Sequence, residues 1–293
     1  HLRDVPALDG QRDHDKPPSP RWPHGIRAQP RQHLGRAVAG RRSTAASRTM
    51  VKHGKHWPLV KAAIFFVAWV WGAAAAAQDA CRLALALAID VSSSVDEDEY
   101  ALQKNGLAAA LDASEVRDAI LYGGQGYVVL AVYEWSGFGQ QVLQLDWAIL
   151  QSHGDINRAA VAISQMERSH DDFPTSIGPA LGFGAQLLAR APFCARQVID
   201  VSGDGVNNDR YGPREAYRHF NLAGVTVNGL VVLGDDPDVE EYYLTEVLHG
   251  SQAFMITAAG YEDFRAAMTR KLYREVSDLV VSRAISQPRA NGG

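Results

Sequence analysis

Three short stretches of the sequence carry closely spaced oxygen-bearing side chains. The first holds Asp90, Ser92 and Ser94 at positions i, i+2 and i+4, the second holds Thr175, and the third holds Asp204. Carboxylate and hydroxyl oxygens, without sulfur or imidazole, suit Mg²⁺, Ca²⁺ or Mn²⁺ rather than zinc or copper. Two carboxylates just neutralise a divalent ion, and side chains from three loops do not readily fill six coordination positions. We therefore expect a bound cation with one open ligand position.

Each stretch follows or precedes an element that could bring it to a common edge. The apolar run Leu83–Val91 predicts a strand covered on both faces, and it contains Asp90 at its end. A second predicted strand, Gln197–Ser202, precedes Asp204, and Thr175 lies just before a predicted helix, Ile177–Ala189. Because the carboxyl ends of parallel strands meet at one edge of a sheet, the three stretches should converge there.

The rest of the pattern alternates strands with helices. The other expected strands are Tyr127–Trp135, Gln141–Trp147, Val225–Leu233 and Ala253–Thr257, the first two joined by a hairpin-like connection at Ser136–Gly139. The other expected helices are Asp96–Leu111, Ile156–Met166, Pro213–Leu222, Val239–Leu248 and Tyr261–Val280. Six strands alternating with helices predict a three-layer, doubly wound α/β domain with a mostly parallel sheet.

The N-terminal region differs in composition from the rest. Residues 1–49 contain 10 Lys/Arg against 4 Asp/Glu and 6 of the 13 prolines, without a helix or strand period. Such a stretch is expected to be disordered, or to be an upstream extension from a misassigned start with Met50 as the true one. A basic arm for nucleic acid or anionic lipid is the alternative.

An export signal is predicted after Met50. Basic residues at 52, 55 and 61 precede the run Ala62–Ala77, and small residues at its end fit cleavage before Gln78. The run has 16 residues, fewer than the roughly 20 that span a bilayer as a helix. We therefore expect a signal peptide at 50–77 that is cleaved, with no stable membrane span afterwards, and a periplasmic or secreted protein. A retained anchor is the alternative.

The expected mature chain is acidic. Residues 78–293 hold 16 Lys/Arg and 29 Asp/Glu, a net charge of −13. Such a surface repels phosphate backbones and argues against nucleic acid as a partner. The expected domain spans 78–285, and a polar tail occupies 286–293.

The three oxygen-bearing stretches, in this order, resemble the metal-ion-dependent adhesion site of von Willebrand factor type A domains. The sequence at residues 81–100, 199–208 and 261–265 is similar to that of a branch of exported bacterial proteins in that superfamily, which contain a domain of unknown function. The resemblance covers roughly residues 80–285. It implies the strand order 3-2-1-4-5-6 with strand 3 antiparallel.

The resemblance also implies a role for each residue of the site. Ser92 and Ser94 would contact the cation directly, Thr175 directly or through water, and Asp90 and Asp204 mostly through water. Two positions depart from the family pattern: Ser93 stands where glycine is frequent, and Gly203 stands where Thr or Ser precedes the aspartate. The second departure could change the groups that orient Asp204.

Simpler interpretations exist for single parts of the motif. Ser94 and Glu97 also fit a helix capping box, and Thr175 alone is a plausible helix-entry residue. Residues 200–205 imitate the start of an EF-hand loop, but the twelfth position is Tyr211 instead of Glu. The acidic run at 235–238 fits a solvated turn that caps the next helix, or a second cation site, and residues 207–209 fit turn chemistry or a partner contact.

The two cysteines have no CxxC spacing. In the strand order that the resemblance implies, the strands of Cys81 and Cys194 are parallel neighbours, and both sulfurs lie a similar distance before the aspartate of their strand. Export allows them to form a disulfide. Two buried free thiols are the alternative.

The function implied is metal-dependent protein binding, in which a cation, expected to be Mg²⁺ with Ca²⁺ or Mn²⁺ possible, accepts an Asp or Glu side chain of a partner protein. No residue is expected to be catalytic. The alternatives are a metal-dependent hydrolase that uses the ion as a Lewis acid, and a structural module whose ion tightens loops. No histidine or lysine has an identifiable place beside the motif to act as a base.

Overall fold

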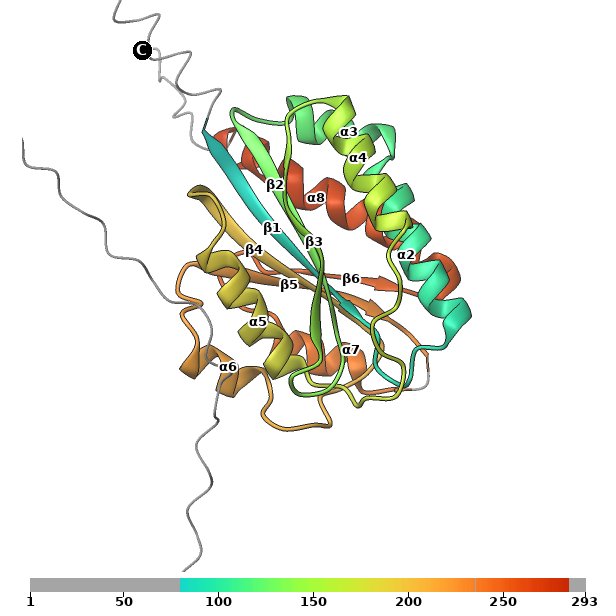
Figure 1. Cartoon of the computed structure of the whole chain (residues 1–293). Helices are drawn as coiled ribbons and strands as arrows, with labels where there is room; N and C mark the ends of the chain where they lie inside the picture. Colours follow the sequence, from blue (N-terminus) through green and yellow to red (C-terminus); the bar gives the residue numbers. More distant parts are fainter. Residues whose placement is uncertain (1–79, 235, 285–293) are drawn as a thin grey trace, which may run out of the picture. The chain divides into compact units, whose positions relative to one another are not determined.

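A six-stranded sheet in the order β3-β2-β1-β4-β5-β6 forms the centre of the domain (Figure 1). The computed structural model describes residues 80–234 and 236–284, with side chains described as far as 277. The strands are β1 (Cys81–Asp90), β2 (Tyr127–Trp135), β3 (Gln141–Leu150), β4 (Cys194–Gly203), β5 (Val225–Val232) and β6 (Met255–Ala258). All neighbouring strands are parallel except β2 and β3. The predicted fold class, strand order and antiparallel third strand are confirmed.

Strand β1 lies in the middle of the sheet because both of its faces are apolar. All ten of its residues are buried. Its leucines point into a core formed with α2, α3, α4 and α8, whereas its alanines face α5. The small alanines meet a helix that is itself rich in glycine, so α5 packs close to the sheet.

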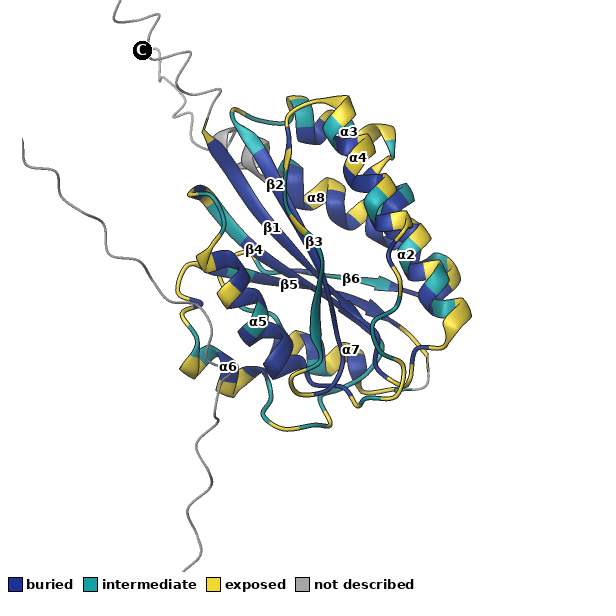
Figure 2. Cartoon of the chain, viewed as in Figure 1, coloured by how far each residue is buried: buried dark blue, intermediate teal, exposed yellow. Residues whose placement is uncertain are grey.

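Helices cover both faces of the sheet (Figures 1 and 2). One layer contains α2 (Glu97–Leu111), α3 (Ser114–Tyr122), α4 (His153–Ser164) and α8 (Phe264–Ala284), and a 3₁₀ turn, η2 (Tyr261–Asp263), precedes α8. The other layer contains α5 (Ile177–Ala189), α6 (Pro213–His219), α7 (Val239–Tyr242) and a π-helix, η1 (Tyr243–Val247). Each layer buries its own apolar cluster against the sheet.

Several elements differ from the sequence-based expectation. The prediction contained no helix at α3, whose N-cap residue Ala113 makes no side-chain capping bond and so gives no start signal. The expected helix Val239–Leu248 is one α-helical turn followed by the π-helix. Strand β3 continues three residues beyond Trp147, and α6 ends at His219.

The predicted disulfide is present between Cys81 and Cys194. The two residues are paired neighbours at the start of β1 and β4, at the edge of the sheet opposite Asp90 and Asp204. They lie 113 residues apart in sequence, and closing a loop of that length contributes about 4–5 kcal/mol in the chain-entropy model.

Some predictions concern residues outside those that the structure describes. These are the N-terminal extension 1–49, the signal peptide 50–77 and the tail 286–293. Within residues 80–234 and 236–284, the helices are too short or too polar to cross a bilayer.

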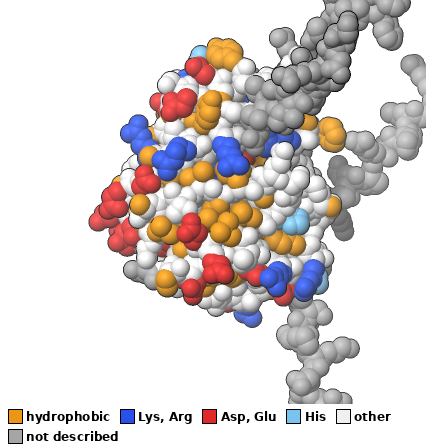
Figure 3. Space-filling model, turned by 180° about the vertical axis from the view of Figure 1, so that it is seen from behind, with side chains coloured by type: hydrophobic (Ala, Val, Ile, Leu, Met, Phe, Trp, Pro, Cys, Tyr) orange, Lys and Arg blue, Asp and Glu red, His pale blue; other side chains and the backbone are white. Residues whose placement is uncertain are grey.

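On the face opposite to that of Figure 1, acidic and basic side chains are interspersed, and acidic ones gather along one edge (Figure 3).

Candidate metal centre

The carboxyl ends of β1 and β4 and the loop before α5 meet at one edge of the sheet. Ser92 Oγ lies 3.2 Å from Ser94 Oγ, which donates to Asp204 Oδ1 at 2.8 Å. Thr175 Oγ1 lies 3.4 Å from Ser92 Oγ, and the Ser92 N–H donates to Asp90 Oδ1 at 2.8 Å. The structure therefore brings together all five residues that the sequence singled out.

The centre is buried at its base and open at its rim. Asp90 and Ser92 are fully buried and Thr175 nearly so, whereas Ser94 is exposed and Asp204 is partly exposed. Burial raises the pKa of the Asp90 carboxyl to about 8, and repulsion from the Asp204 carboxylate adds to the rise. Solvent reaches the cluster from the side of Ser94.

The residues present fit a divalent cation. Asp90 Oδ2 is buried and has no hydrogen-bond partner among the described residues, so one acceptor at the base of the cluster is unsatisfied. All converging donors are hydroxyl or carboxylate oxygens, the ligands that Mg²⁺, Ca²⁺ and Mn²⁺ prefer. A cation would also offset the repulsion between Asp90 and Asp204. Within the described part of the chain, no three His, Cys, Asp or Glu residues form a metal-binding group, so hydroxyls are essential to this donor set.

Arg168 holds the loop after β1 in place. Its guanidinium donates to the carbonyl oxygens of Val91, Ser92 and Val95 at 3.2, 3.1 and 2.6 Å. Gln103 on α2 adds a bond from its Nε2 to the Asp90 carbonyl at 3.0 Å. The sequence analysis missed both residues, because neither lies near the motif in sequence or belongs to a recognisable pattern.

The capping-box interpretation of Ser94 is wrong. The box at the start of α2 consists of Asp96 and Glu99, each of which accepts a hydrogen bond from the other's backbone N–H. The spacing is the same as that of Ser94 and Glu97 but shifted by two residues. As a result, the Ser94 hydroxyl is available to bond Asp204.

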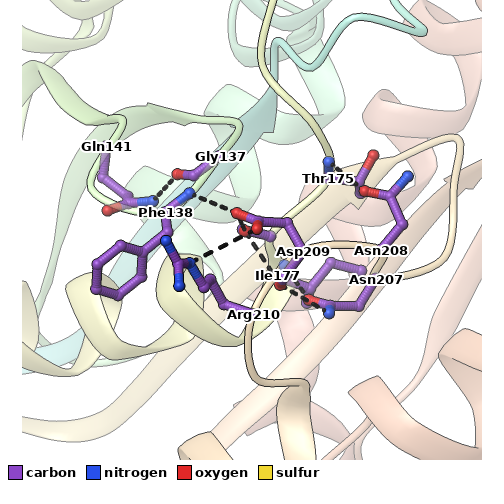
Figure 4. A network of polar contacts seen from close by, with 10 residues as sticks. Gly137, Phe138, Gln141, Thr175, Ile177, Asn207, Asn208, Asp209 and Arg210 are labelled. Carbon is purple, nitrogen blue, oxygen red and sulfur yellow. Dashed lines mark hydrogen bonds and ion pairs between the residues drawn. The ribbon is translucent and has the colours of Figure 1, made fainter. Parts of the chain in front are cut away.

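The segment after Asp204 fixes the loop that contains Thr175 (Figure 4). The Asn208 side chain accepts from the Thr175 N–H at 2.9 Å, and the Asn208 N–H donates to the Thr175 carbonyl at 2.9 Å. Asn207 Oδ1 accepts from the Ile177 N–H at 2.7 Å. These asparagines therefore do more than form a local turn: they link the Asp204 loop to the Thr175 loop.

Asp209 extends this network to the β2–β3 hairpin. Its Oδ2 accepts from Ser176 Oγ at 2.6 Å and from the Phe138 N–H at 3.0 Å. Arg210 has a φ of 56°, a left-handed conformation that is unfavourable for a residue with a side chain. Its guanidinium lies 5.3 Å from the centre of the Phe138 ring, on the exposed surface beside the Thr175 loop.

The acidic run before α7 also contacts the centre's loops. Asp236 Oδ2 accepts from the Val206 N–H at 3.1 Å, and its Oδ1 accepts from the Asp238 N–H at 3.0 Å. Asp238 occupies the N-cap position of α7 without a side-chain capping bond, so capping by this residue is not observed. Asp235 lies outside the described residues.

The fold is that of von Willebrand factor type A-like domains, as comparison with solved structures shows. Proximal thread matrix protein 1 from the mussel byssus, with a zinc-occupied MIDAS motif, is similar with a TM-score of 0.50 and 16% identity over 69% of this chain and 49% of that chain. The PilB minor pilin from Streptococcus sanguinis has a TM-score of 0.51 and 14% identity over 72% and 64%. The pilus adhesin SpaC from Lactobacillus rhamnosus GG has a TM-score of 0.50 and 13% identity over 69% and 31%.

These likenesses concern the fold, because identity is low and the chain spans about half of the mussel protein and a third of SpaC. No curated protein sequence matches the chain. A family profile matches residues 80–280, which include every residue of the candidate metal centre. The chain therefore belongs to the family described as "Protein of unknown function (DUF1194)".

Proposed function

We propose that this domain binds a protein partner through a divalent cation held by Asp90, Ser92, Ser94, Thr175 and Asp204. One observation carries the proposal: oxygens from three separate loops form a continuous set of contacts of 2.8–3.4 Å around a buried carboxylate with an unsatisfied oxygen. Mg²⁺ is the expected ion, and Ca²⁺ or Mn²⁺ would suit the same donors.

The charge of the five donor side chains determines how strongly a bound cation attracts a further ligand. Three of its side chains are neutral hydroxyls, so little negative charge surrounds the ion apart from Asp90 and Asp204. When bound, the cation supplies a positive centre with a free ligand position. Because Ser94 is exposed, we expect that position at the protein surface, where an Asp or Glu side chain of a partner could reach it in a charge-assisted contact.

The comparisons support this function by analogy of fold. Two of the similar structures are a pilus adhesin and a minor pilin, and a third contains a MIDAS motif occupied by zinc. The hydrolase alternative has less support, because within the described part of the chain no histidine or lysine side chain makes a hydrogen bond or ion pair with the five site residues. The proposal includes export by the signal at 50–77 to the periplasm or beyond the cell.

The test uses the exported protein and two variants. Thr175→Ala removes one hydroxyl of the centre, and Thr269→Ala removes an exposed hydroxyl that donates to Arg265 O on α8. Calorimetry should detect Mg²⁺ uptake by the wild type and by Thr269→Ala, and not by Thr175→Ala. Proteins captured by the immobilised domain in Mg²⁺ should elute with EDTA, and capture should require an Asp or Glu of the captured protein. Wild-type protein that takes up no divalent ion, or captures equally in EDTA, would disprove the proposal.

A further inference from the structure

Gly203, the last residue of β4, borders the base of the metal centre. A Cβ atom on Gly203 would lie 2.6 Å from Tyr243 Oη and 2.8 Å from Asp90 Oδ2. Both distances are shorter than any normal contact of a Cβ. The space that a side chain at position 203 would need is thus lined by two oxygens, one from β1 and one from η1.

Both oxygens are buried and without a partner. Asp90 and Tyr243 are fully buried, and neither Asp90 Oδ2 nor Tyr243 Oη has a hydrogen bond within the described residues. Trp135 Nε1 is a third buried group with no hydrogen-bond partner in the described part of the chain, and its ring lies 3.3 Å from the same Cβ position. An unsatisfied buried polar group destabilises the folded state, and three such groups surround this one glycine.

Two glycines leave the space that the Tyr243 side chain occupies. A Cβ on Gly229 of β5 would lie 2.8 Å from Tyr243 Cδ1, so the ring passes over one glycine and the hydroxyl reaches another. Tyr243 is also the first residue of the π-helix. π-Helical turns are rare and occur frequently at functional sites. The tyrosine therefore extends from η1 across β5 and β4 towards Asp90 on β1.

We propose that the Tyr243 hydroxyl positions Asp90 for the cation by donating a hydrogen bond to Oδ2, directly or through one water. A tyrosine hydroxyl is protonated at neutral pH and can donate. Ser92 already bonds Oδ1, so this second bond would fix both carboxylate oxygens. Gly203, which has no side chain, leaves room for the Tyr243 hydroxyl. The inference rests on the proposed function, and Tyr243 is a positioning residue because it acts through Asp90.

Two variants test the proposed contact between the Tyr243 hydroxyl and Asp90 Oδ2. Tyr243→Phe removes the hydroxyl and keeps the ring, whereas Gly203→Ala keeps the tyrosine and adds a methyl group that displaces its hydroxyl, Asp90 Oδ2 or both, because the new Cβ would lie 2.6 and 2.8 Å from them. Each should weaken Mg²⁺ binding about tenfold, the lower end of the effect of removing a group that orients a metal ligand. Mg²⁺ alone is the probe, measured by calorimetry on the exported protein.

The chain contains a matched control pair. Tyr133 is also fully buried, its hydroxyl donates to Ala180 O at 2.9 Å, and a Cβ on Gly184 would lie 2.8 Å from that hydroxyl. Tyr133→Phe and Gly184→Ala therefore disturb a buried tyrosine–glycine contact away from the cation, and they should keep the wild-type affinity. Thermal unfolding in EDTA shows how much stability each of the four variants loses.

The outcomes separate the two proposals. Weaker Mg²⁺ binding in Tyr243→Phe and Gly203→Ala, with unchanged affinity in the control pair, supports the positioning role. Wild-type affinity in Tyr243→Phe overturns it whatever Gly203→Ala does, because the added methyl group can also displace Asp90 directly. An equal loss of affinity in all four variants, which would follow from destabilisation alone, overturns it as well. If the wild type takes up no divalent ion, the proposed function fails first and the inference falls with it.

Discussion

The Ser94 hydroxyl donates to Asp204 Oδ1 at 2.8 Å, although the two residues lie 110 positions apart in sequence. This contact joins the loop after β1 to the loop after β4. The first loop is also held by Arg168, and the second is held by Asn208, whose side chain accepts from the backbone N–H of Thr175. The geometry of the centre is therefore determined mainly by residues that would not touch a cation.

Asp204→Asn should separate metal binding from stability. The amide keeps an oxygen that can accept from Ser94 but removes a charge, so Mg²⁺ affinity should fall by at least about 100-fold, more than loss of an orienting group causes. In EDTA, the free energy of unfolding should be equal to that of the wild type or higher, because the repulsion that helps to raise the Asp90 pKa is gone. Calorimetry and urea denaturation in EDTA measure the two effects.

The control for this prediction is Asp146→Asn. Asp146 is an exposed carboxylate on β3 that pairs with Arg190 at 3.1 Å, so its loss should leave Mg²⁺ affinity unchanged. Retention of Mg²⁺ binding in Asp204→Asn would contradict the assignment of Asp204.

Bound cation should stabilise the native state against heat. A ligand present at 100 times its Kd contributes about 2.7 kcal/mol, and for a domain of this size each kcal/mol raises Tm by about 2–4 °C. We therefore expect Mg²⁺ to raise Tm by roughly 5–10 °C, and EDTA to reverse the rise. The shift should be absent in Thr175→Ala, and a full shift in that variant would place the cation elsewhere.

Arg168→Ala should destabilise the protein by about 2–4 kcal/mol in urea denaturation. Its guanidinium is partly buried, and one of its nitrogens donates to three carbonyl oxygens of the loop after β1. A hydrogen bond to a charged group contributes about 1.5–3 kcal/mol net of the exchange with water, and three acceptors that share one nitrogen contribute less than three such bonds. Arg158 is the matched control, because its side chain is 75% exposed and pairs with Asp155. Arg158→Ala should change stability by less than about 0.5 kcal/mol. Equal effects of the two substitutions would show that Arg168 does not hold the loop.

The fold and the convergence of the five oxygen-bearing residues followed from the sequence, and the groups that support them did not. The apolar run of β1 and the order of the motif residues are local signals, and they sufficed to place Asp90, Ser92 and Ser94 at one edge of the sheet. Arg168 and Tyr243 reach the centre from segments without a motif. Their roles depend on how α4 and η1 pack against the sheet, and such packing leaves no periodic signature in sequence.

A buried ionic cluster between β4 and α8 gives a prediction of pH dependence. Lys271 Nζ lies 2.9 Å from Asp200 Oδ1 and 3.1 Å from Glu275 Oε1, and Asn228 of β5 donates to Glu275 at 2.6 Å. One cation thus faces two carboxyl groups. Burial raises the pKa of Asp200 to about 7, Lys271 opposes the rise, and Glu275 adds to it.

The sign of the effect follows from proton binding. An unfolded Asp titrates near pH 4, so between about pH 4 and pH 7 the native state holds a proton that the unfolded state has released. The free energy of unfolding contributed by Asp200 therefore falls as pH rises through this window, by at most about 1.4 kcal/mol per pH unit, and levels off above it. Asp200→Asn, which cannot titrate, should lack this slope.

Urea denaturation in EDTA at several pH values between about 4.5 and 8 measures the difference between wild type and Asp200→Asn. Asp90, whose pKa is also raised, contributes to the slope of both proteins and cancels in the difference. Asp146→Asn should retain the wild-type slope in this window, because its backbone bond from Trp147 lowers the pKa of Asp146 and its titration lies at more acidic pH. If Asp200→Asn shows the same slope as the wild type, the cluster does not hold the extra proton, and α8 is joined to β4 by an ionised pair throughout the range.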